Sequence, residues 1–348
     1  MEAPIGFGLV GLGMVAQYHA DAIRALEARH NVRLAGVAAR DPERARAFAE
    51  RNGVPFHTGD LAALLARPEI QVVCILTPSG AHLEPGLQAL AAGKHVVIEK
   101  PLEITLERVD ALLAAAERAG LLVSAIFQAR FSSGARALRA AVDAGRFGRL
   151  ALCSAYVKWH RSAAYYTGWK GTLDLDGGGA VMNQAIHALD LLQWLAGMPT
   201  EVFAWSARRV HTGIEAEDTA CAAFRFAHGG LGVLEATTAA YPGWGRRLEL
   251  CGELGSAAIE DDRIVRWDFR EALPGDAGLL AAAAGPGLSG AGDPAQLGSL
   301  GHQLQLEEVV GALRGRAPLS VTGRDARHAV ALIAGIYQSA RSGMPVKL

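Results

Sequence analysis

Three short stretches of the sequence combine residue types that could bind an anion or move a proton. They are the glycine-rich run Gly11–Ala16, the tripeptide Glu99–Pro101 and the segment Gly177–Asp190. Histidine titrates near neutrality and a desolvated lysine approaches neutrality, so either side chain can accept a proton from a reacting hydroxyl. The lysine and the histidine within these stretches are Lys100 and His187.

The glycine-rich run, GLGMVA, follows a short apolar strand and opens a helix. Glycine permits a tight turn, and backbone N–H groups at a helix N-terminus can bind a pyrophosphate. The motif is weak evidence by itself, but its place after the first strand of a strand–helix series favours a dinucleotide site. The predicted cofactor contacts in this run are Gly11, Gly13, Met14 and Val15.

The residues at the end of the second predicted strand should determine whether the site prefers NAD or NADP. An acid there would bind the ribose hydroxyls of NAD, whereas an arginine accommodates the 2′-phosphate of NADP. The acid position falls on Ala39 and Arg40 follows it, which favours NADP over NAD. Two alternatives remain open. In the first, Arg40 is solvated and Asp41 only caps the next helix. In the second, the acid position lies one residue further along the chain, so that Asp41 is the ribose ligand and NAD is favoured.

The first 125 residues alternate short apolar segments with helical ones, which predicts a doubly wound α/β domain at 1–125. The expected strands are Ile5–Val10, Arg33–Ala38, Gln71–Leu76, His95–Ile98 and Leu121–Ala125. Three helices are expected. The first begins at Asp41, the second covers 83–92 and ends at Gly93, and the third covers 106–119 and ends at Gly120.

From residue 126 the pattern changes to longer strands that follow one another, which predicts an α+β domain at 126–348 with a mostly antiparallel sheet. The expected strands are Leu150–Trp159, Glu201–Val210, Thr219–Phe226, Leu231–Thr238 and Arg247–Leu250. The expected helices are 134–144, 180–195, 303–313 and 323–340, and the nearly uncharged segment 274–300 is expected to be a mobile loop.

Composition restricts the class of partner. The chain has 348 residues, 34 Lys and Arg, 35 Asp and Glu, and a net charge of −1, without the basic excess of a nucleic-acid binder. The apolar run Ala329–Tyr337 is far shorter than the ~20 residues of a membrane span, and no basic segment precedes the first apolar run. The four cysteines are far apart and predict reduced, mostly buried thiols, hence a cytoplasmic protein.

Together with the segment Thr77–His82 (TPSGAH), these motifs resemble the Gfo/Idh/MocA oxidoreductase family over nearly the whole chain. The resemblance implies a Rossmann domain followed by an open-faced sheet domain through which the protein forms a dimer or tetramer. It also implies NAD(P)-dependent hydride transfer to or from a carbon of a sugar, cyclitol or sugar nucleotide. A cis peptide before Pro101 is expected as well, since X–Pro is the bond where the cis form costs little.

The family's catalytic lysine falls on Lys100 and its histidine falls on His187. Many members carry aspartate four residues before that histidine, one helical turn away. Here the residue is Asn183, which can hold a substrate hydroxyl but cannot stabilise an imidazolium by charge. The departure leaves the base open between His187 and Lys100, and it favours the branch of the family that acts on sugar nucleotides.

Other candidates surround these three residues. The expected cofactor contacts also include Thr77, Pro78, His82, Glu99 and Lys100. The expected substrate contacts are Arg130, Tyr166, Trp169, Lys170, Asn183 and His187, with His302 as a weaker candidate. His187 and Asp190 on one helix are too few ligands for a metal site, so no metal is expected, and Asp190 is expected to support structure.

A different class of function is compatible with the same fold, namely a cofactor-binding regulator without catalysis. Such proteins tend to lose the lysine and the histidine, and this chain keeps both Lys100 and His187. The sequence therefore favours an enzyme. It does not separate an ordinary dehydrogenase from one whose cofactor stays bound and is recycled by a second substrate.

Overall fold

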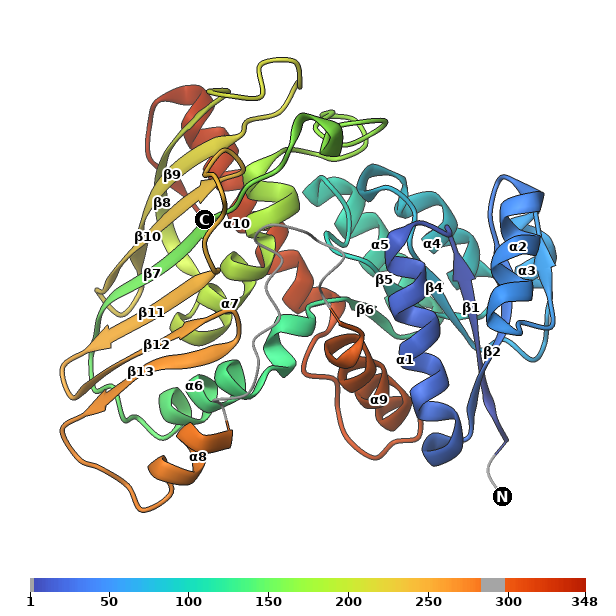
Figure 1. Cartoon of the computed structure of the whole chain (residues 1–348), viewed down its shortest axis with the longest axis horizontal. Coiled ribbons are helices and arrows are strands. Elements are labelled where there is room, and N and C mark those ends of the chain that lie inside the picture. The colour runs from blue at the N-terminus through green and yellow to red at the C-terminus, as the bar shows by residue number, and fades with distance from the viewer. Residues whose placement is uncertain (1–2, 283–297) are drawn as a thin grey trace. The chain divides into compact units, whose positions relative to one another are not determined.

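The computed structural model describes residues 3–282 and 298–348 (Figure 1). The chain forms two compact units. The first contains Met1–Gln128 and Gly298–Arg327, and the second contains Ala129–Leu297 and His328–Leu348. The sequence-based division at residue 125 differs from this arrangement because a late segment of the chain returns to the first unit.

The first unit is built on a six-stranded parallel sheet in the order β3-β2-β1-β4-β5-β6. Its strands are β1 (Ile5–Val10), β2 (Val32–Ala38), β3 (His57–Thr58), β4 (Val72–Ile75), β5 (His95–Ile98) and β6 (Val123–Ala125). Its helices are α1 (Met14–His30), α2 (Pro42–Asn52), α3 (Leu61–Leu65), α4 (Leu83–Ala91), α5 (Leu106–Ala119) and α9 (Leu300–Leu313). This strand order is that of a Rossmann fold, so the predicted doubly wound domain is confirmed.

The order of the strands also locates the ligand side of this sheet. The chain leaves β1 toward one side and β4 toward the other, and ligands of doubly wound sheets bind beyond the carboxyl ends of strands at such a switch point. The glycine-rich run follows β1, and the segment Thr77–His82 follows β4. Both predicted motifs therefore stand where a dinucleotide would bind.

The return of α9 has a clear physical cause. Leu306, Val309 and Val310 are fully buried in the core that α1, α2 and the sheet form together. Helix α9 also meets α1 through an ion pair of His30 with Glu307, at 3.0 Å between Nε2 and Oε1. The helix was expected at 303–313, but its apolar residues do not reveal which sheet they cover.

The second unit is built on an eight-stranded sheet in the order β13-β12-β11-β7-β10-β9-β8-β14. Its strands are β7 (Leu150–Lys158), β8 (Pro199–Ala207), β9 (Thr219–Phe226), β10 (Leu231–Thr237), β11 (Arg247–Gly252), β12 (Gly255–Glu260), β13 (Arg263–Phe269) and β14 (Val346–Lys347). Its helices are α6 (Ser133–Asp143), α7 (Ile186–Ala196), α8 (Asp276–Ala282) and α10 (Gly323–Ser342), whose first turn belongs to the first unit. Strands β7 and β10 pair in parallel and the other pairs are antiparallel, as expected of a mostly antiparallel sheet.

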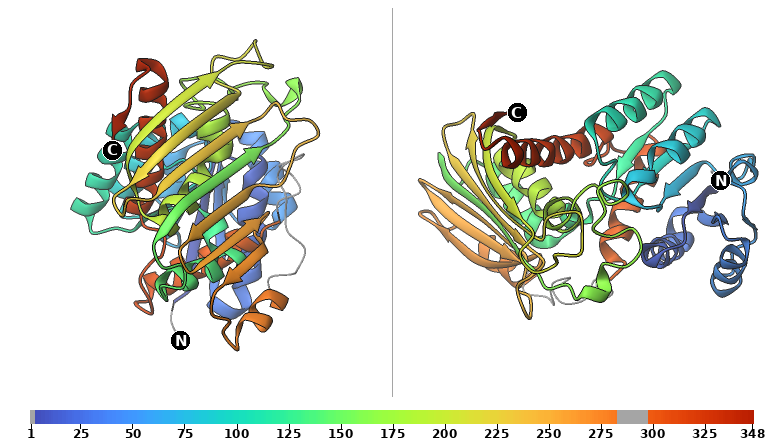
Figure 2. Two further views of the ribbon diagram at one scale, coloured as in Figure 1. Left: turned by 90° about the vertical axis from the view of Figure 1, so that its left-hand side faces the viewer. Right: turned by 90° about the horizontal axis from the view of Figure 1, so that it is seen from above.

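One face of this sheet is covered by helices of its own unit, and no helix of the described residues lies on the other face (Figure 2). Three expectations need correction. Strands β12 and β13 were not expected, the helix expected from Ala180 begins as a π-helix, and α8 occupies part of the expected loop 274–300. Residues 283–297 of that loop lie outside the described residues.

Candidate functional site

The turn after β1 has the geometry that a pyrophosphate requires. Gly11 has φ +90°, and a Cβ there would lie 2.8 Å from the carbonyl carbon of Leu76 at the end of β4. A Cβ on Gly13 would meet no atom within 4 Å, so the glycine keeps open the space before the helix. Ala16, the small residue that completes the motif, is fully buried.

The start of α1 is free to receive an anion. Its N-cap, Gly13, makes no side-chain capping bond, and the first helical turn holds no acidic residue. The first N–H groups of a helix carry a partial positive charge, and the N–H groups of Met14 and Val15 belong to that set. The residues of this turn therefore fit a dinucleotide.

The residues that follow β2 form the N-terminus of α2. Asp41 caps α2, since its Oδ1 accepts the N–H groups of Glu43 at 3.0 Å and Arg44 at 3.3 Å. Arg40 is exposed, and Ala39 occupies the position of the expected acid. This engagement of Asp41 weakens the alternative in which Asp41 binds the ribose.

A cavity of about 520 Å³ lies beside the glycine-rich turn, between α1 and α2. Its lining residues are Leu12, Gly13, Met14, Gln17, Arg44, Ala47, Phe48 and Arg51. The sequence analysis missed Arg44 and Arg51. The sequence contained a pattern that could have identified them, because two arginines at i and i+7 of a helix lie on the same face.

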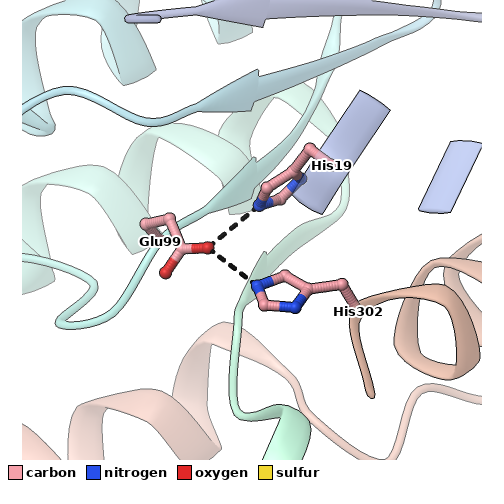
Figure 3. A group of neighbouring side chains, drawn as sticks. All are labelled: His19, Glu99 and His302. Atoms are coloured by element: carbon pink, nitrogen blue, oxygen red, sulfur yellow. Dashed lines mark hydrogen bonds and ion pairs between the residues drawn. The ribbon is translucent and has the colours of Figure 1, made fainter. Parts of the chain in front are cut away.

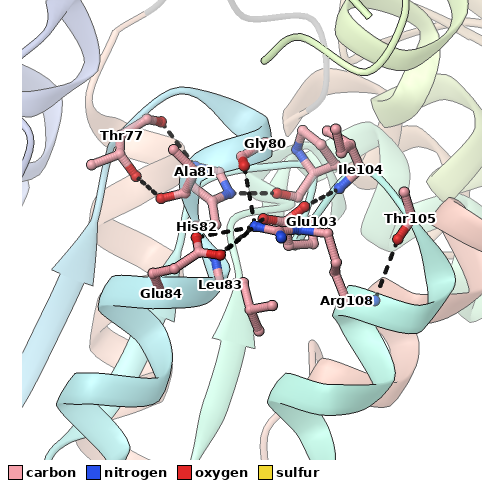
Figure 4. Close-up of polar contacts among 11 residues, drawn as sticks. Thr77, Gly80, Ala81, His82, Leu83, Glu84, Glu103, Ile104, Thr105 and Arg108 are labelled. Carbon is pink, nitrogen blue, oxygen red and sulfur yellow. Dashed lines mark hydrogen bonds and ion pairs between the residues drawn. The ribbon is translucent and has the colours of Figure 1, made fainter. Parts of the chain in front are cut away.

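The loop after β4 is tied to the loop after β5 by His82 (Figure 4). The ring of His82 is almost fully buried, with Nδ1 2.9 Å from the carbonyl oxygen of Pro101 and Nε2 2.9 Å from that of Thr77. Thr77 Oγ1 donates to the carbonyl of Ala81 at 2.8 Å, and Pro78 precedes that turn. Burial lowers the pKa of His82, and its ring joins two backbone loops.

A second acid behind this loop was missed by the sequence analysis. Glu103 is fully buried and accepts hydrogen bonds from the Leu83 N–H at 3.1 Å and the Ile104 N–H at 2.7 Å. Arg108 donates to the same carboxylate at 2.9 Å and also to Gly80 (Figure 4). Together they fix the starts of α4 and α5.

Lys100 follows β5 in a bend that matches the expectation, because the Lys100–Pro101 peptide is cis. The carboxylate of Glu99 accepts the backbone N–H of Lys100 at 3.2 Å and is itself buried against His19 and His302 (Figure 3). Burial alone would raise the pKa of Glu99, but the hydrogen bonds from the two histidines outweigh it and hold that pKa well below its usual value. Glu99 thus holds the loop as a carboxylate.

In the second unit, the triple glycine allows the chain to pass close to another buried acid. A Cβ on Gly179 would lie 1.8 Å from the carbonyl oxygen of Glu217, and one on Gly178 would lie 2.0 Å from the hydroxyl of Tyr337. The Glu217 carboxylate accepts the N–H of Val181 at 2.8 Å and the hydroxyl of Tyr337 at 3.0 Å. Glycine is needed at both positions, because a side chain at 179 would collide with the backbone of Glu217 and one at 178 would collide with Tyr337.

The helix that carries His187 and Asn183 starts with a π-helical segment, Ala180–Ala185, before α7. The i, i+4 spacing that placed the two residues on one face is a property of α-helices, so it does not carry through this wider turn. His187 lies in the first turn of α7 and is 8% exposed. Single π-helical turns inside helices are frequent at functional sites.

Asn183 is part of a hydrogen-bond network. Its Nδ2 donates to the carboxylate of buried Asp176, and its Oδ1 accepts from Gln184 Nε2 at 2.8 Å. An aspartate at this position would face the carboxylate of Asp176 and repel it. The contact with Asp176 therefore gives a physical reason for an amide instead of an acid at position 183.

The aromatic and cationic segment after β7 gathers around Tyr165. Lys170 Nζ donates to the Tyr165 hydroxyl at 2.9 Å, and Gln184 Nε2 donates to it at 2.8 Å. Lys170 Nζ also lies 4.3 Å from the Tyr165 ring centroid and 4.9 Å from that of Trp169. The structure therefore brings the predicted residues Trp169 and Lys170 to the network of Asn183.

Arg161 completes this network and was not predicted. Its guanidinium donates to Gln184 Oε1 at 2.9 Å and stacks between the rings of Trp159 and Tyr165. The Tyr166 ring meets that of Tyr165 edge to face, but its hydroxyl lies 2.6 Å from Thr238 Oγ1, and burial raises its pKa to about 12. We assign Tyr166 to packing of the sheet.

Arg130 is held apart from these residues by a buried ion pair. Its Nε and Nη2 donate to the two carboxylate oxygens of Asp190 at 2.7 and 2.6 Å, and its guanidinium lies over the ring of Trp194. Removing one partner of such a pair leaves an uncompensated buried charge. The ion pair gives Arg130 and Asp190 a structural role, and the substrate contact expected of Arg130 stays a prediction.

Comparisons with known proteins agree with the motifs. Residues 5–127 match the oxidoreductase family with an NAD-binding Rossmann fold, and residues 135–258 match the GFO/IDH/MocA C-terminal domain. The chain belongs to the Gfo/Idh/MocA oxidoreductase family. It is an NAD(P)-dependent oxidoreductase, since its relatives include dehydrogenases and solved structures with NADH.

Among solved structures of this family, the WlbA dehydrogenase of Bordetella pertussis in complex with NADH and UDP-GlcNAcA is 32% identical. The match covers 100% of this chain and 99% of that one, with a TM-score of 0.92. The WlbA dehydrogenase of Chromobacterium violaceum, with the same ligands, is also 32% identical over 100% of this chain and 97% of that one, with a TM-score of 0.89. Inositol 2-dehydrogenase of Rhizobium meliloti is 30% identical over 75% of this chain and 77% of its own length.

Two expectations about the whole chain can be compared with the described residues. None of their helices combines the length and apolarity needed to cross a membrane. Their cysteines are all free; Cys74 and Cys153 are buried, Cys251 is half-buried and Cys221 is exposed. The expectation of mostly buried thiols is therefore wrong for Cys221, which lies on the uncovered face of the sheet.

The close approach at Gly179 gives a test of the second unit. Gly179→Ala should lower the free energy of unfolding by about 1–3 kcal/mol or more, because the new Cβ overlaps the Glu217 carbonyl. Denaturant titration followed by tryptophan fluorescence measures the change. Gly213→Ala is the control, since a Cβ there meets no atom within 4 Å. Equal midpoints for the two variants would contradict the assigned role of Gly179.

Proposed function

We propose that this chain oxidises or reduces a carbinol carbon of a nucleotide-linked sugar with NAD(P), with Lys100 and His187 as the groups that handle the proton. The similarity to WlbA dehydrogenase along the whole chain carries the proposal, because that structure holds NADH and UDP-GlcNAcA. Retention of both Lys100 and His187 supports an enzyme over a regulator of the same fold.

In the oxidative direction of the proposed reaction, the substrate loses one hydride from carbon and one proton from its hydroxyl. The nicotinamide, when bound, accepts the hydride from the carbinol carbon. The hydroxyl proton passes to His187 or to Lys100, and the C–O bond becomes a carbonyl. The reverse direction returns both to a carbonyl substrate. The bend after β5 presents Lys100, and the first turn of α7 presents His187.

The network around Tyr165 supports a substrate that carries negative charge. Lys170 and Arg161 bring two cations to it, and no carboxylate of the described residues lies within ion-pair distance of Lys170 Nζ. Aromatic faces at Trp169 and Tyr165 suit the apolar face of a sugar ring, and cations suit a sugar carboxylate or a phosphate. We therefore favour a nucleotide-linked sugar acid over a neutral cyclitol.

Two variants test the catalytic assignment. Lys100→Met and His187→Ala should each lower kcat about 10²–10⁴-fold, because each removes a positioned acid–base group. The affinity for the cofactor should fall far less than kcat, since neither residue belongs to the Gly11–Ala16 turn that would hold the pyrophosphate. The assay follows nicotinamide absorbance with UDP-GlcNAcA and a panel of free sugars and cyclitols.

Exposed residues of the same types provide controls for this assay. Lys347→Met and His328→Ala should leave kcat unchanged. If His187→Ala keeps most of its activity while Lys100→Met does not, Lys100 is the base and His187 only binds substrate. Full activity in both variants would refute the catalytic assignment, and activity on free sugars alone would refute the nucleotide-linked substrate.

The preference for NADP is also a proposal, and it rests on exposed Arg40 next to Ala39, with Arg44 in the neighbouring cavity. Arg40→Ala should shift the ratio of NADP to NAD affinity toward NAD by about 1.5–3 kcal/mol, the size of one charge-assisted contact. Titration of both cofactors into wild type and variant measures it, with exposed Arg29→Ala as the control. An unchanged ratio would show that Arg40 is merely solvated.

The open face of the second sheet supports self-association. Leu231 of β10 lies beside Leu152 of β7, and both are exposed, as is Trp205 of β8. An uncovered apolar sheet face of this kind typically marks an interface. Trp205→Arg with Leu231→Arg should convert a dimer or tetramer into a monomer in light scattering, whereas Val210→Arg, exposed outside the strands, should not. A wild-type protein that is monomeric at micromolar concentration would contradict this interface.

A further inference from the structure

The carboxylate of Glu99 accepts hydrogen bonds from three sides. Its Oε1 lies 2.9 Å from His19 Nε2 and 3.2 Å from His302 Nε2, and its Oε2 accepts the backbone N–H of Lys100 at 3.2 Å. Figure 3 shows the two rings converging on one oxygen from α1 and from α9. The two rings also meet edge to face, with centroids 5.1 Å apart. Glu99 therefore connects two helices to the loop that carries Lys100.

The protonation state of this cluster follows from its burial. Both ring Nδ1 atoms are buried and have no hydrogen-bond partner among the described residues. A proton on either Nδ1 would be a buried donor without an acceptor, which is costly, so both rings carry their proton on Nε2. Burial also lowers the pKa of His19, which keeps this ring neutral. Glu99 is thus a carboxylate that accepts two Nε2–H donors on one oxygen.

We propose that His19 and His302 are positioning residues for Lys100. By fixing Oε1 of Glu99 they orient Oε2, and Oε2 fixes the backbone from which the Lys100 side chain leaves. The proposal rests on the proposed function of Lys100. It also gives the return of α9 a role in the reaction, because His302 lies in the first turn of that helix.

The same three side chains could hold a divalent cation, since two imidazoles and a carboxylate form a common ligand set. The structure favours the hydrogen-bonded cluster. Oε1 is at hydrogen-bond distance from both rings, and Oε2 is engaged by the amide of Lys100. A cation would have to displace both N–H donors. A metal-bound state is therefore an outcome of the test and not part of the proposal.

Variants of His302 test the positioning role. His302→Leu should lower kcat about 10²-fold, the cost of misplacing a reacting group by about an ångström. His302→Gln should recover most of the rate, because its amide N–H can reach the same oxygen. The Kd for the cofactor should stay within about twofold of wild type. His30→Leu is the matched control, since it breaks another His–Glu contact between α1 and α9 without touching Glu99.

A double-mutant cycle separates positioning from general stability. His302→Leu should not lower the residual rate of Lys100→Met any further, because the residue acts through Lys100. Hydrogen exchange gives a readout besides activity: the peptide containing the Lys100 amide should exchange faster in His302→Leu and normally in His30→Leu. If His302→Leu fails to fold, His19→Leu, which removes the other donor to the same oxygen, carries the same comparison.

The remaining outcomes each overturn a defined statement. Equal losses from His302→Leu in the wild-type and Lys100→Met backgrounds would show a merely structural role. A stoichiometric divalent metal in purified wild-type protein, lost in His302→Leu, would replace the proposal with a metal site. Full activity of Lys100→Met would refute the proposed function itself, whereas inactive Lys100→Met with fully active His302→Leu would refute only the positioning role.

Discussion

Buried carboxylates that accept backbone N–H groups hold the loops on which the candidate residues stand. A loop that leaves a strand or opens a helix carries amides without partners, and a buried amide must find an acceptor. Glu99 supplies it to Lys100, and Glu103 supplies it to the starts of α4 and α5. In the second unit Glu217 does the same for the π-helical turn after the triple glycine. Each acid is kept ionic or hydrogen-bonded by neighbours from distant parts of the chain.

This arrangement explains how far the sequence could be interpreted. Five of the six parallel strands of the first unit are short, continuous apolar runs, and the glycine-rich turn directly follows β1, so these elements were predicted correctly, whereas the two-residue strand β3 was not. The triple glycine was recognised by resemblance, but its physical reason was not, since the carbonyl that it avoids belongs to Glu217. Local sequence patterns identify the glycine at which the chain turns, but they do not identify the distant residue against which that glycine packs.

The same limit applies to contacts between distant residues. The sequence placed Arg130 after a strand as a candidate substrate ligand, but it could not show the ion pair with Asp190, which is 60 residues away and is brought close only by the fold. His19 gave no signal inside an otherwise ordinary amphipathic helix. The sequence singled out Tyr166 and not its neighbour Tyr165, and their hydroxyls have different partners, since that of Tyr165 accepts from Lys170 and that of Tyr166 lies beside Thr238. The similarity to solved structures and to the family models shows the fold and the family of this chain, while these networks come only from its own structure.

The return of α9 has a consequence for the way the protein is made. A ribosome completes the strands of the first unit long before it reaches Leu306, Val309 and Val310, yet these side chains belong to the core of that unit. Seven of the eight strands of the second sheet, β7 to β13, are synthesised in the interval. The nascent first unit therefore waits with an apolar face uncovered while a second, larger β-structure emerges, the situation in which chaperones most often bind a growing chain. Segments 1–128 and 298–327 would have to be joined, or supplied together, for the dinucleotide-binding unit to be isolated intact.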